Sequence, residues 1–367
     1  MIHGLRLIRC ASPCRGFSSS DPERAPLIRP GLGPWHTSCK TTVVTILRFL
    51  LLRLLKMAAI VLAIIIIDFL LIHAAPGDPA SVIAGQSGAA DPKFLEQLRH
   101  EFGLDLPLLQ QLGIYLNGIL HGDLGISHRQ QRTVASLIIE RLPATLLLTT
   151  TAFIFALAAG IALGAAAARR AGSLADSVIT ILALAFYATP IFWVGLMLVL
   201  VFSVWLEWLP SFGMGTVGAN LHGIAAMIDV IPYLVLPSLT LGLFYMAVYA
   251  RLTRASMLEV ADQDFVKTAR AKGVPEGRIL RRHILRNALL PVITFAGIQA
   301  GQLIGGSILV ETVFAWPGIG RLAFEALLAR DYQVLLGVFL TTSILVVVFN
   351  LVTDLLYLVA DPRMELA

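Results

Sequence analysis

The sequence predicts an all-α integral membrane protein with six transmembrane helices. The first observation is composition, because 57% of the 367 residues are hydrophobic and 14% are charged, whereas soluble domains carry about 25% charged residues. The second is length: six apolar stretches each suffice to cross about 30 Å of hydrocarbon, which takes roughly 20 residues of helix. They are residues 51–75, 142–168, 178–206, 231–250, 288–310 and 334–360.

Residues 1–45 precede the first of these stretches and are rich in Arg, Ser, Pro and Gly without an apolar run. This composition predicts a disordered basic extension. We expect that the start codon was assigned too far upstream, with initiation near Val43 or Val44; the acidic residues of the extension fit the alternative, an organellar transit peptide, poorly. The first transmembrane helix is then expected over residues 46–75.

Residues 76–141 are too polar to cross a membrane and long enough to fold, so we expect a helical cap between the first and second spans. Asp91 followed by Pro92 is typical of a helix start, and this helix is expected to end at Gly103. A second helix is expected from Pro107, with an apolar stripe that packs on the spans beneath it. The stripe comprises Leu108, Leu112, Tyr115 and Ile119.

Basic residues set the orientation of the spans, because Lys and Arg concentrate in short cytoplasmic loops. Arg169 and Arg170 follow the second span, and a dense basic run lies within residues 251–286, whereas residues 207–230 contain neither Lys nor Arg. Both termini are therefore expected on the cytoplasmic side of the inner membrane, with the cap on the opposite side. Residues 142–365 are expected to form a core of five helices.

A basic helix-turn-helix over residues 256–287 joins the fourth and fifth spans. Its first helix is expected to run from Ser256 to Lys272, where Gly273 ends it. The second helix is expected to run into the fifth span, with arginines on one face and apolar residues on the other. The arginine face comprises Arg278, Arg282 and Arg286, and the apolar face comprises Leu280, Ile284 and Ala288.

Three interpretations of this basic loop compete. DNA binding by a helix-turn-helix is disfavoured, because the second helix runs directly into a membrane span. A loop whose arginines contact lipid phosphates explains the charge. It does not explain the small residues Ala269, Ala271 and Gly273, which make the tip slim. A docking site for a cytoplasmic protein explains both features.

The loop resembles the EAA loop of the permease subunits of binding-protein-dependent ABC importers, and further motifs resemble the dipeptide, oligopeptide and nickel branch of that family in the same order. These motifs are PGDP (76–79), GDLGIS (122–127), WLPSFG (208–213), RNALLPV (286–292), WPGIGRL (316–322), RDY (330–332) and ADPRM (360–364). The resemblance implies a permease subunit that carries di- or oligopeptides across the membrane. Import of nickel or another small solute by the same architecture is the alternative.

The resemblance also implies partners: a second, homologous permease, two ABC ATPase subunits, an extracytoplasmic solute-binding protein and the surrounding lipid. An ATPase subunit would contact the tip of the basic loop. The coupling residues there are Phe265, Lys267, Ala269, Arg270, Ala271, Lys272 and Gly273. The solute-binding protein would dock on the cap through Asp78 and Asp123, for which capping of turns within the cap is the alternative.

The sequence lacks the residues of an ATP site, because no GxxxxGK(S/T) phosphate loop occurs. ATP is therefore expected to be used by the partner subunits, and this chain is expected to be no enzyme and to bind no cofactor. All three cysteines lie within residues 1–45, and no zinc-spaced set of His and Cys occurs, so no metal site is expected. Nucleic acid is not an expected partner.

Secondary transport is the runner-up mechanism. Ion-coupled carriers place ionisable residues inside their spans, and Asp68 and Asp354 are the two candidates. For the translocation path we expect Gln299 and Gln302, which share one face of the fifth span, and Thr189, which precedes the proline that interrupts the third. Helix packing is the alternative role for the glycines beside the two glutamines.

Overall fold

The computed structural model describes residues 38–74, 105–127, 129–219 and 221–360, together with residues 96 and 100. The chain divides into two units, Met1–Leu51 and Leu52–Ala367, with the boundary inside the first helix. Most described residues are helical, which confirms the all-α class apart from one two-stranded ladder. All elements after the first helix belong to the second unit.

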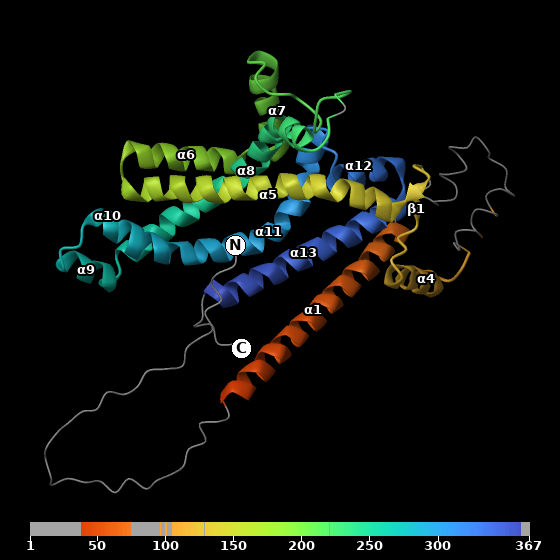
Figure 1. Cartoon of the computed structure of the whole chain (residues 1–367), viewed down its shortest axis with the longest axis horizontal. Coiled ribbons are helices and arrows are strands. Elements are labelled where there is room, and N and C mark those ends of the chain that lie inside the picture. Colours follow the sequence, from red (N-terminus) through yellow and green to blue (C-terminus); the bar gives the residue numbers. More distant parts are fainter. Residues whose placement is uncertain are drawn as a thin grey trace, which may run out of the picture. The chain divides into compact units, whose positions relative to one another are not determined.

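Figure 1 shows the elements in chain order. The helices are α1 (Ser38–Ala74), α4 (Leu108–Leu120), α5 (Val134–Arg169), α6 (Leu174–Ala188), α7 (Ile191–Leu198), α8 (Ile224–Ala261), α9 (Asp264–Ala271), α10 (Glu276–Arg278), α11 (Arg286–Val313), α12 (Ile319–Ala329) and α13 (Tyr332–Ala360). Two π-helical segments, η1 (Val199–Trp205) and η2 (Ile279–Leu285), continue α7 and α10. The strands β1 (Ile126–Ser127) and β2 (Arg132–Thr133) pair antiparallel, with Ile126 opposite Thr133.

The centre of the fold is the pair α5 and α8, which pack against each other along much of their length. Small residues allow this close approach: a Cβ on Gly160 of α5 would lie 2.6 Å from Tyr249 Cβ of α8. Ala152, Ala156 and Gly164 continue the same buried face of α5 at four-residue spacing. Close packing of backbones, as is typical between helices in membranes, therefore joins these two helices.

Three clusters of buried side chains form the core. The central cluster unites α5, α8 and α11 around Leu148, Leu241 and Tyr249. A second cluster joins the start of α5 to α12 and α13, and a third lies beneath α9 and η2. The bundle thus has a small core of its own at each end, which we call the α12 end and the α9 end (Figure 1).

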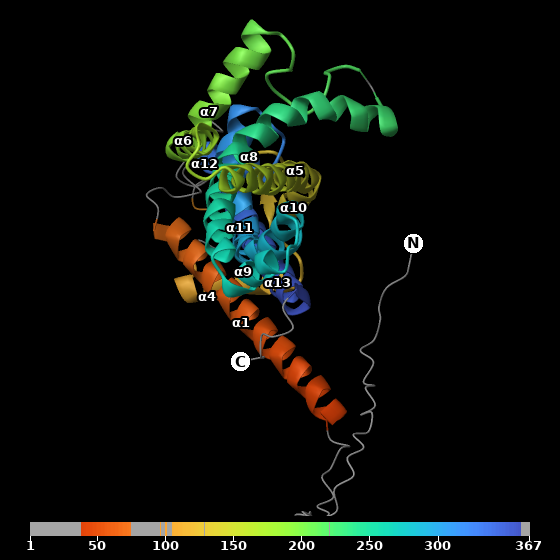
Figure 2. The ribbon, with the colours of Figure 1, turned by 90° about the vertical axis from the view of Figure 1, so that its left-hand side faces the viewer.

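Four of the described helices are long and apolar enough to cross a membrane, and a fifth crossing results if α6 and α7–η1 count as one. The four are Val134–Arg169, Ile224–Ala261, Glu276–Leu303 and Tyr332–Thr353. The expected third span, residues 178–206, is broken at Thr189 and Pro190, where its two halves are bent by 108° (Figures 1 and 2). Thr189 is extended there, and Pro190 has no N–H to continue the helix.

Other helices start or end beyond their expected limits. α1 begins at Ser38 rather than at residue 46, α5 begins at Val134 rather than at residue 142, and α8 extends past both expected ends. Hydropathy marks only the part of a helix that faces hydrocarbon, whereas polar turns lengthen it on either side. At the start of α5 these turns carry an exposed ion pair, with Arg132 Nη2 2.8 Å from Glu140 Oε2.

The expected cap is described in part, because most of its first helix and Asp78 lie outside the described residues. Its second helix is confirmed as α4, which follows Pro107 and ends before Gly122, whose φ is +76°. Tyr115 of the apolar stripe stacks on Phe69 of α1, with ring centroids 6.0 Å apart. This helix therefore contacts α1, the helix expected to form the first span.

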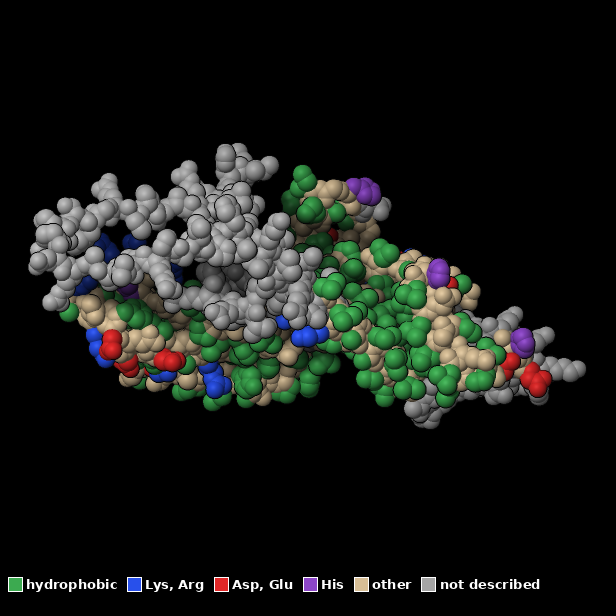
Figure 3. All heavy atoms as spheres, turned by 90° about the horizontal axis from the view of Figure 1, so that it is seen from below, with side chains coloured by type: hydrophobic (Ala, Val, Ile, Leu, Met, Phe, Trp, Pro, Cys, Tyr) green, Lys and Arg blue, Asp and Glu red, His purple; other side chains and the backbone are tan. Residues whose placement is uncertain are grey.

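The surface of the bundle separates charged from apolar regions (Figure 3). In the face shown, Lys and Arg lie mainly toward the α9 end and Asp and Glu lie at both ends, whereas the middle is largely hydrophobic. Exposed apolar side chains of the long helices include Ile139, Ile154, Ile181, Leu182 and Ile298. An apolar band of this size on a helical bundle fits lipid rather than water.

Candidate functional site

The basic loop at the α9 end consists of a short helix, a tight turn and a second helix that continues into α11. α8 continues to Ala261, and a break at Asp262 and Gln263 separates it from α9. The expectation of one helix from Ser256 to Lys272 is therefore wrong. α9 is a separate short helix, so its side chains do not continue the helical periodicity of α8. The residues that α9 exposes therefore differ from those that one continuous helix would expose.

The expected stop at Gly273 is confirmed. Gly273 has a φ of +74°, and its N–H donates to Arg270 O at 2.9 Å, while Val274 N donates to Ala269 O at 3.2 Å. These two hydrogen bonds form a Schellman motif, which satisfies the last carbonyls of α9. A Cβ on Gly273 would meet no atom within 4 Å, so this position requires glycine for its backbone conformation and not for space.

The structure corrects the expected position of Ala269. Ala269 and Val266 lie on the inner face of α9 and are buried against Ile279, because residues three apart share one face of a helix. The other expected coupling residues are exposed. They are Phe265, Lys267, Arg270, Ala271, Lys272 and Gly273.

Two basic side chains of this tip have acidic partners within the chain. Lys267 Nζ lies 3.0 Å from Asp264 Oδ1, and Arg270 Nε lies 2.8 Å from Glu276 Oε1. Exposed ion pairs of this kind contribute at most about 1 kcal/mol. An acidic partner protein can therefore replace either carboxylate at small cost.

The second arm of the loop is helical without a break from Glu276 to Val313, through α10, η2 and α11. Its arginine face is exposed as expected. The π-helical winding of η2 changes its inner face, since Ile279 and Ile284 are buried whereas Leu280 is only half-buried. The tip is thus connected to α11 both by continuous helix and by a packed core.

A cavity of about 700 Å³ lies between α6, α8 and α11. Two of the three expected path residues, Gln299 and Gln302, line it. Thr189 does not; its hydroxyl donates to Ala185 O at 2.7 Å at the end of α6. The other polar and aromatic lining residues are Thr180, Tyr187, Phe244, Tyr245, Arg251, Arg254 and Phe295.

A partly buried ion pair at this cavity joins α6 to α8. Arg254 Nε and Nη2 donate to the two carboxylate oxygens of Asp176 at 2.6 and 2.8 Å. Gly172 N donates to the same carboxylate at 2.9 Å. Two parallel bonds of this kind fix geometry as well as charge. This pair was not predicted from the sequence, because its two residues are 78 positions apart.

The two aspartates considered for ion coupling are not brought together among the described residues. Asp68 is half-buried on α1. Asp354 belongs to α13, and its side chain lies outside the described part of the chain.

At the α12 end the structure joins two motifs that are far apart in the sequence. Ser127 of GDLGIS donates its hydroxyl hydrogen to Asp331 Oδ2 of RDY at 2.6 Å. Asp123 is exposed, and its Oδ1 accepts a hydrogen bond from Gly125 N at 2.9 Å. Asp123 therefore caps a turn of the cap, which was the alternative to a docking role.

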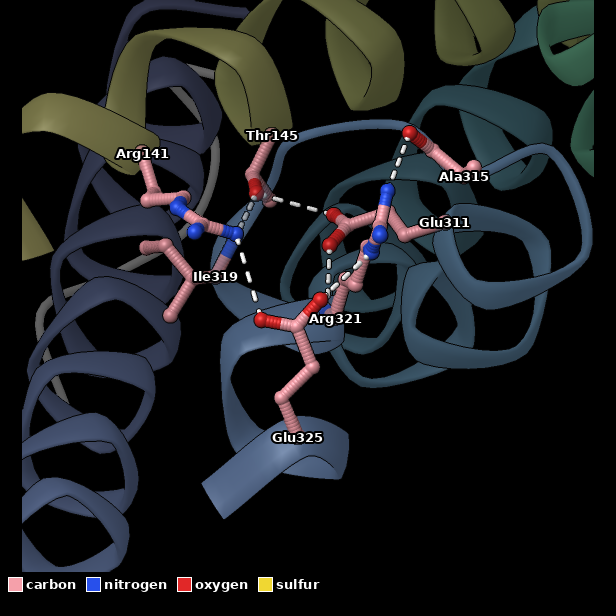
Figure 4. A network of polar contacts seen from close by, with 7 residues as sticks. All are labelled: Arg141, Thr145, Glu311, Ala315, Ile319, Arg321 and Glu325. Carbon is pink, nitrogen blue, oxygen red and sulfur yellow. Dashed lines mark hydrogen bonds and ion pairs between the residues drawn. The ribbon is translucent and has the colours of Figure 1, made fainter. Parts of the chain in front are cut away.

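A completely buried carboxylate also lies at the α12 end (Figure 4). Glu311, near the end of α11, is 0% exposed. Its Oε1 accepts from Thr145 Oγ1 at 2.8 Å and from Ser307 Oγ at 3.0 Å. Its Oε2 accepts from Arg321 N at 3.0 Å in the first turn of α12. The carboxylate thus satisfies the free N–H groups at the start of α12 and lies at the positive end of the helix dipole.

The same cluster fixes the loop between α11 and α12. Thr145 Oγ1 also accepts from Ile319 N at 2.8 Å, and the buried Trp316 donates to a backbone carbonyl of α5 at 2.9 Å. A Cβ on Gly318 would collide with the Glu311 carboxylate. The motif WPGIGRL is therefore the loop that folds around Glu311. The motif is apparent in the sequence, but Glu311, the acidic residue before it that ends an otherwise apolar run, was not among the predicted site residues.

The charged side chains next to this loop are paired. Arg321 Nε lies 2.7 Å from Glu325 Oε1, and Arg141 Nη1 lies 3.7 Å from Glu325 Oε2 (Figure 4). Arg321 Nη1 also donates to Ala315 O at 2.6 Å. Among the described residues, no group of three or more His, Cys, Asp or Glu is placed to hold a metal ion. The arrangement at this end is one of structural support.

Comparison with protein families gives two matches that together span most of the chain. Residues 160–366 match the family described as binding-protein-dependent transport system inner membrane component, and residues 46–149 match the description of its N-terminal part. The EAA-type loop, the cavity and the Glu311 cluster lie largely within the first of these matches.

Similar proteins are known from bacteria. The chain is 40% identical over 336 residues to the dipeptide transport system permease protein DppB of Escherichia coli (strain K12), covering 87% of this chain and 99% of the relative. It is 41% identical over 316 residues to a putative peptide transport system permease protein of Brucella abortus (strain 2308), covering 86% and 98%. A solved chain of the MetNI methionine ABC transporter, in inward-facing conformations, has a similar fold with a TM-score of 0.50 at 18% identity, covering 62% of this chain and 97% of that chain.

Proposed function

The chain belongs to the family of binding-protein-dependent transport system inner membrane components, the permease subunits of ABC importers, and we propose that it forms half of a translocation path for di- and oligopeptides. The observation that carries the choice of solute is the 40% identity to a dipeptide permease along 99% of that protein. The similarity therefore includes the cap side as well as the core.

The proposed path is the cavity between α6, α8 and α11. The side-chain amides of Gln299 and Gln302 can pair with the backbone groups that all peptides share, and the aromatic residues supply apolar walls. A wide site with few fixed polar contacts suits solutes whose side chains vary. Selectivity would then reside mainly in the extracytoplasmic solute-binding protein.

The tip of the α9 end is proposed to dock on an ABC ATPase subunit. It exposes Phe265, Ala271 and Lys272 around the tight turn at Gly273. The unbroken helix from Glu276 through α11 reaches the cavity at Gln299. Displacement of the tip would therefore tilt a helix that lines the path, while ATP is hydrolysed in the partner.

For the assembly we propose six crossings, with α1 as the first and the bent pair of α6 and α7–η1 as the third. Both termini and the α9 end would lie in the cytoplasm, and the cap and the α12 end outside. The proposed partners are a second, homologous permease, two ATPase subunits and a solute-binding protein that docks on the cap through Asp78 and Asp123.

Uptake by whole cells tests the proposed function. A strain in which this gene alone is disrupted should lose uptake of radiolabelled dipeptide and regain it when the gene is restored on a plasmid. Uptake of radioactive nickel is measured in the same cells and should not change. Normal dipeptide uptake after disruption would refute the proposal, and loss of nickel uptake instead would reassign the solute.

A further inference from the structure

Arg251 of α8 is a cation that lines the cavity. Its guanidinium carbon lies 5.9 Å from the centroid of the Tyr187 ring on α6. None of the ion pairs among the described residues includes it. Arg254, one turn further along α8, differs because Asp176 binds it through two hydrogen bonds. The cavity therefore holds one neutralised arginine and one that is free to bind an anion.

Arg251 is held further along α6 than the Asp176–Arg254 ion pair. Asp176 lies in the first turn of α6, and Tyr187 lies three turns further along the same helix, about 16 Å at 1.5 Å per residue. The Arg251 guanidinium, over the Tyr187 ring, therefore lines the cavity at a distance from the Asp176 carboxylate. An arginine in this position is available to the anionic group of a solute.

The lining of the cavity favours an anionic group. Among the described residues that line it, none is Asp, Glu, His or Cys. A bare divalent cation would find amide and hydroxyl oxygens but no carboxylate, imidazole or thiolate ligand among these residues, and Arg251 would repel it. A carboxylate would find a planar guanidinium that can donate two parallel hydrogen bonds.

We propose that Arg251 binds the carboxylate of the transported solute, and that the solutes of this path are therefore zwitterions such as peptides with a free C-terminus. The inference rests on the proposed function, because it takes the cavity as the translocation path. The amides of Gln299 and Gln302 lie in the same cavity and can bind the peptide groups next to that carboxylate.

Direct binding tests the inference without the solute-binding protein. The purified importer, with its partner subunits, is titrated with Ala-Ala and with the C-terminal amide of Ala-Ala, and binding is followed by saturation-transfer NMR. We expect Arg251→Gln to weaken binding of Ala-Ala at least about tenfold, the effect of losing a charge-assisted hydrogen bond. Arg251→Lys should bind Ala-Ala more tightly than Arg251→Gln but less tightly than the wild type, because it keeps the charge without the two parallel hydrogen bonds, and the amide should bind weakly to wild type and to Arg251→Gln alike.

Transport supplies the second measurement. In cells with an unchanged solute-binding protein, Arg251→Gln should lower the maximal rate of Ala-Ala uptake at least about tenfold, while the half-saturating concentration stays near the wild-type value. The matched control is Arg169→Gln, which removes an exposed arginine at the end of α5. Its uptake and binding should equal those of the wild type.

Three results would overturn the inference. They are equal binding of Ala-Ala and its amide by the wild type, wild-type binding and uptake in Arg251→Gln, or a loss of uptake in Arg251→Gln that matches its loss of co-purifying subunits. The last would indicate a structural or lipid-anchoring role. A wild type that imports no peptide at all would refute the proposed function instead, so the two failures are distinguishable.

Discussion

The turn at Gly273 and the Glu311 cluster each hold a short helix against long ones, yet one uses local contacts and the other distant ones. At the turn, Gly273 bonds to Arg270, and Val274 bonds to Ala269. At the cluster, Glu311 bonds to Thr145, 166 positions away in the sequence. The turn is exposed, whereas Glu311 is 0% exposed.

This difference has a mechanical consequence. An exposed element held by local hydrogen bonds can move or accept a partner while the remainder stays folded, whereas a buried network opens only when its surroundings open. We therefore expect the α12 end of the bundle to stay fixed and the α9 end to move. Substitutions at the cluster should reduce stability, and substitutions at the turn should reduce coupling.

Glu311→Ala should have the largest effect on stability. It would leave the hydroxyls of Thr145 and Ser307 and the N–H of Arg321 without their acceptor, and each buried polar group left unsatisfied costs about 1–3 kcal/mol. Thermal unfolding of the detergent-purified protein and its yield in membranes measure this. The control is Glu325→Ala, which removes two partly exposed ion pairs, with Arg321 and Arg141, each worth at most about 1 kcal/mol. Equal melting temperatures for the two variants would contradict a fixed α12 end.

Gly318→Ala should have the next largest effect. The added methyl group would collide with the Glu311 carboxylate, and such overpacking typically costs about 1–3 kcal/mol. Gly305→Ala is the matched control, because a Cβ there meets no atom within 4 Å and alanine favours a helix by up to about 1 kcal/mol. Only Gly318→Ala should lower the melting temperature. If both variants melt like the wild type, the loop around Glu311 is not tightly packed.

The same contrast explains how much of the molecule could be predicted from the sequence. The stop at Gly273 was predicted because a glycine followed by a proline acts on its own backbone. The burial of Ala269 was not predicted, because the break at Asp262 makes α9 a separate helix with its own buried face. The partner of Glu311 was beyond reach, because hydropathy and periodicity report on neighbours and not on residues 166 positions apart. Arg251 was missed likewise, because its cavity forms only when α6 and α11 pack beside α8.

Gly273→Ala should have a small effect on stability and a large one on coupling. A side chain at a φ of +74° costs about 1 kcal/mol, so the protein should still insert and bind the solute-binding protein. The distorted tip should lose productive contact with the ATPase, and peptide-stimulated ATP hydrolysis should fall. Gly277→Ala is the matched control, because Gly277 also has open space around it but no positive φ. Wild-type stimulation in Gly273→Ala would show that this turn only joins two helices.

Asp123 at the cap should give the smallest change in stability, and a pair of variants separates its two roles. Asp123→Ala removes the acceptor of the 2.9 Å hydrogen bond from Gly125 N, which is worth about 0.5–1.5 kcal/mol. Asp123→Asn keeps an acceptor oxygen at the same place and removes only the charge, so its melting temperature should equal that of the wild type.

If Asp123 docks the solute-binding protein through its charge, uptake at limiting binding protein should fall in both variants. Because the turn is intact in Asp123→Asn, a fall there reports docking alone. Wild-type uptake in Asp123→Asn, with a lower melting temperature in Asp123→Ala, would leave turn capping as the role of this residue.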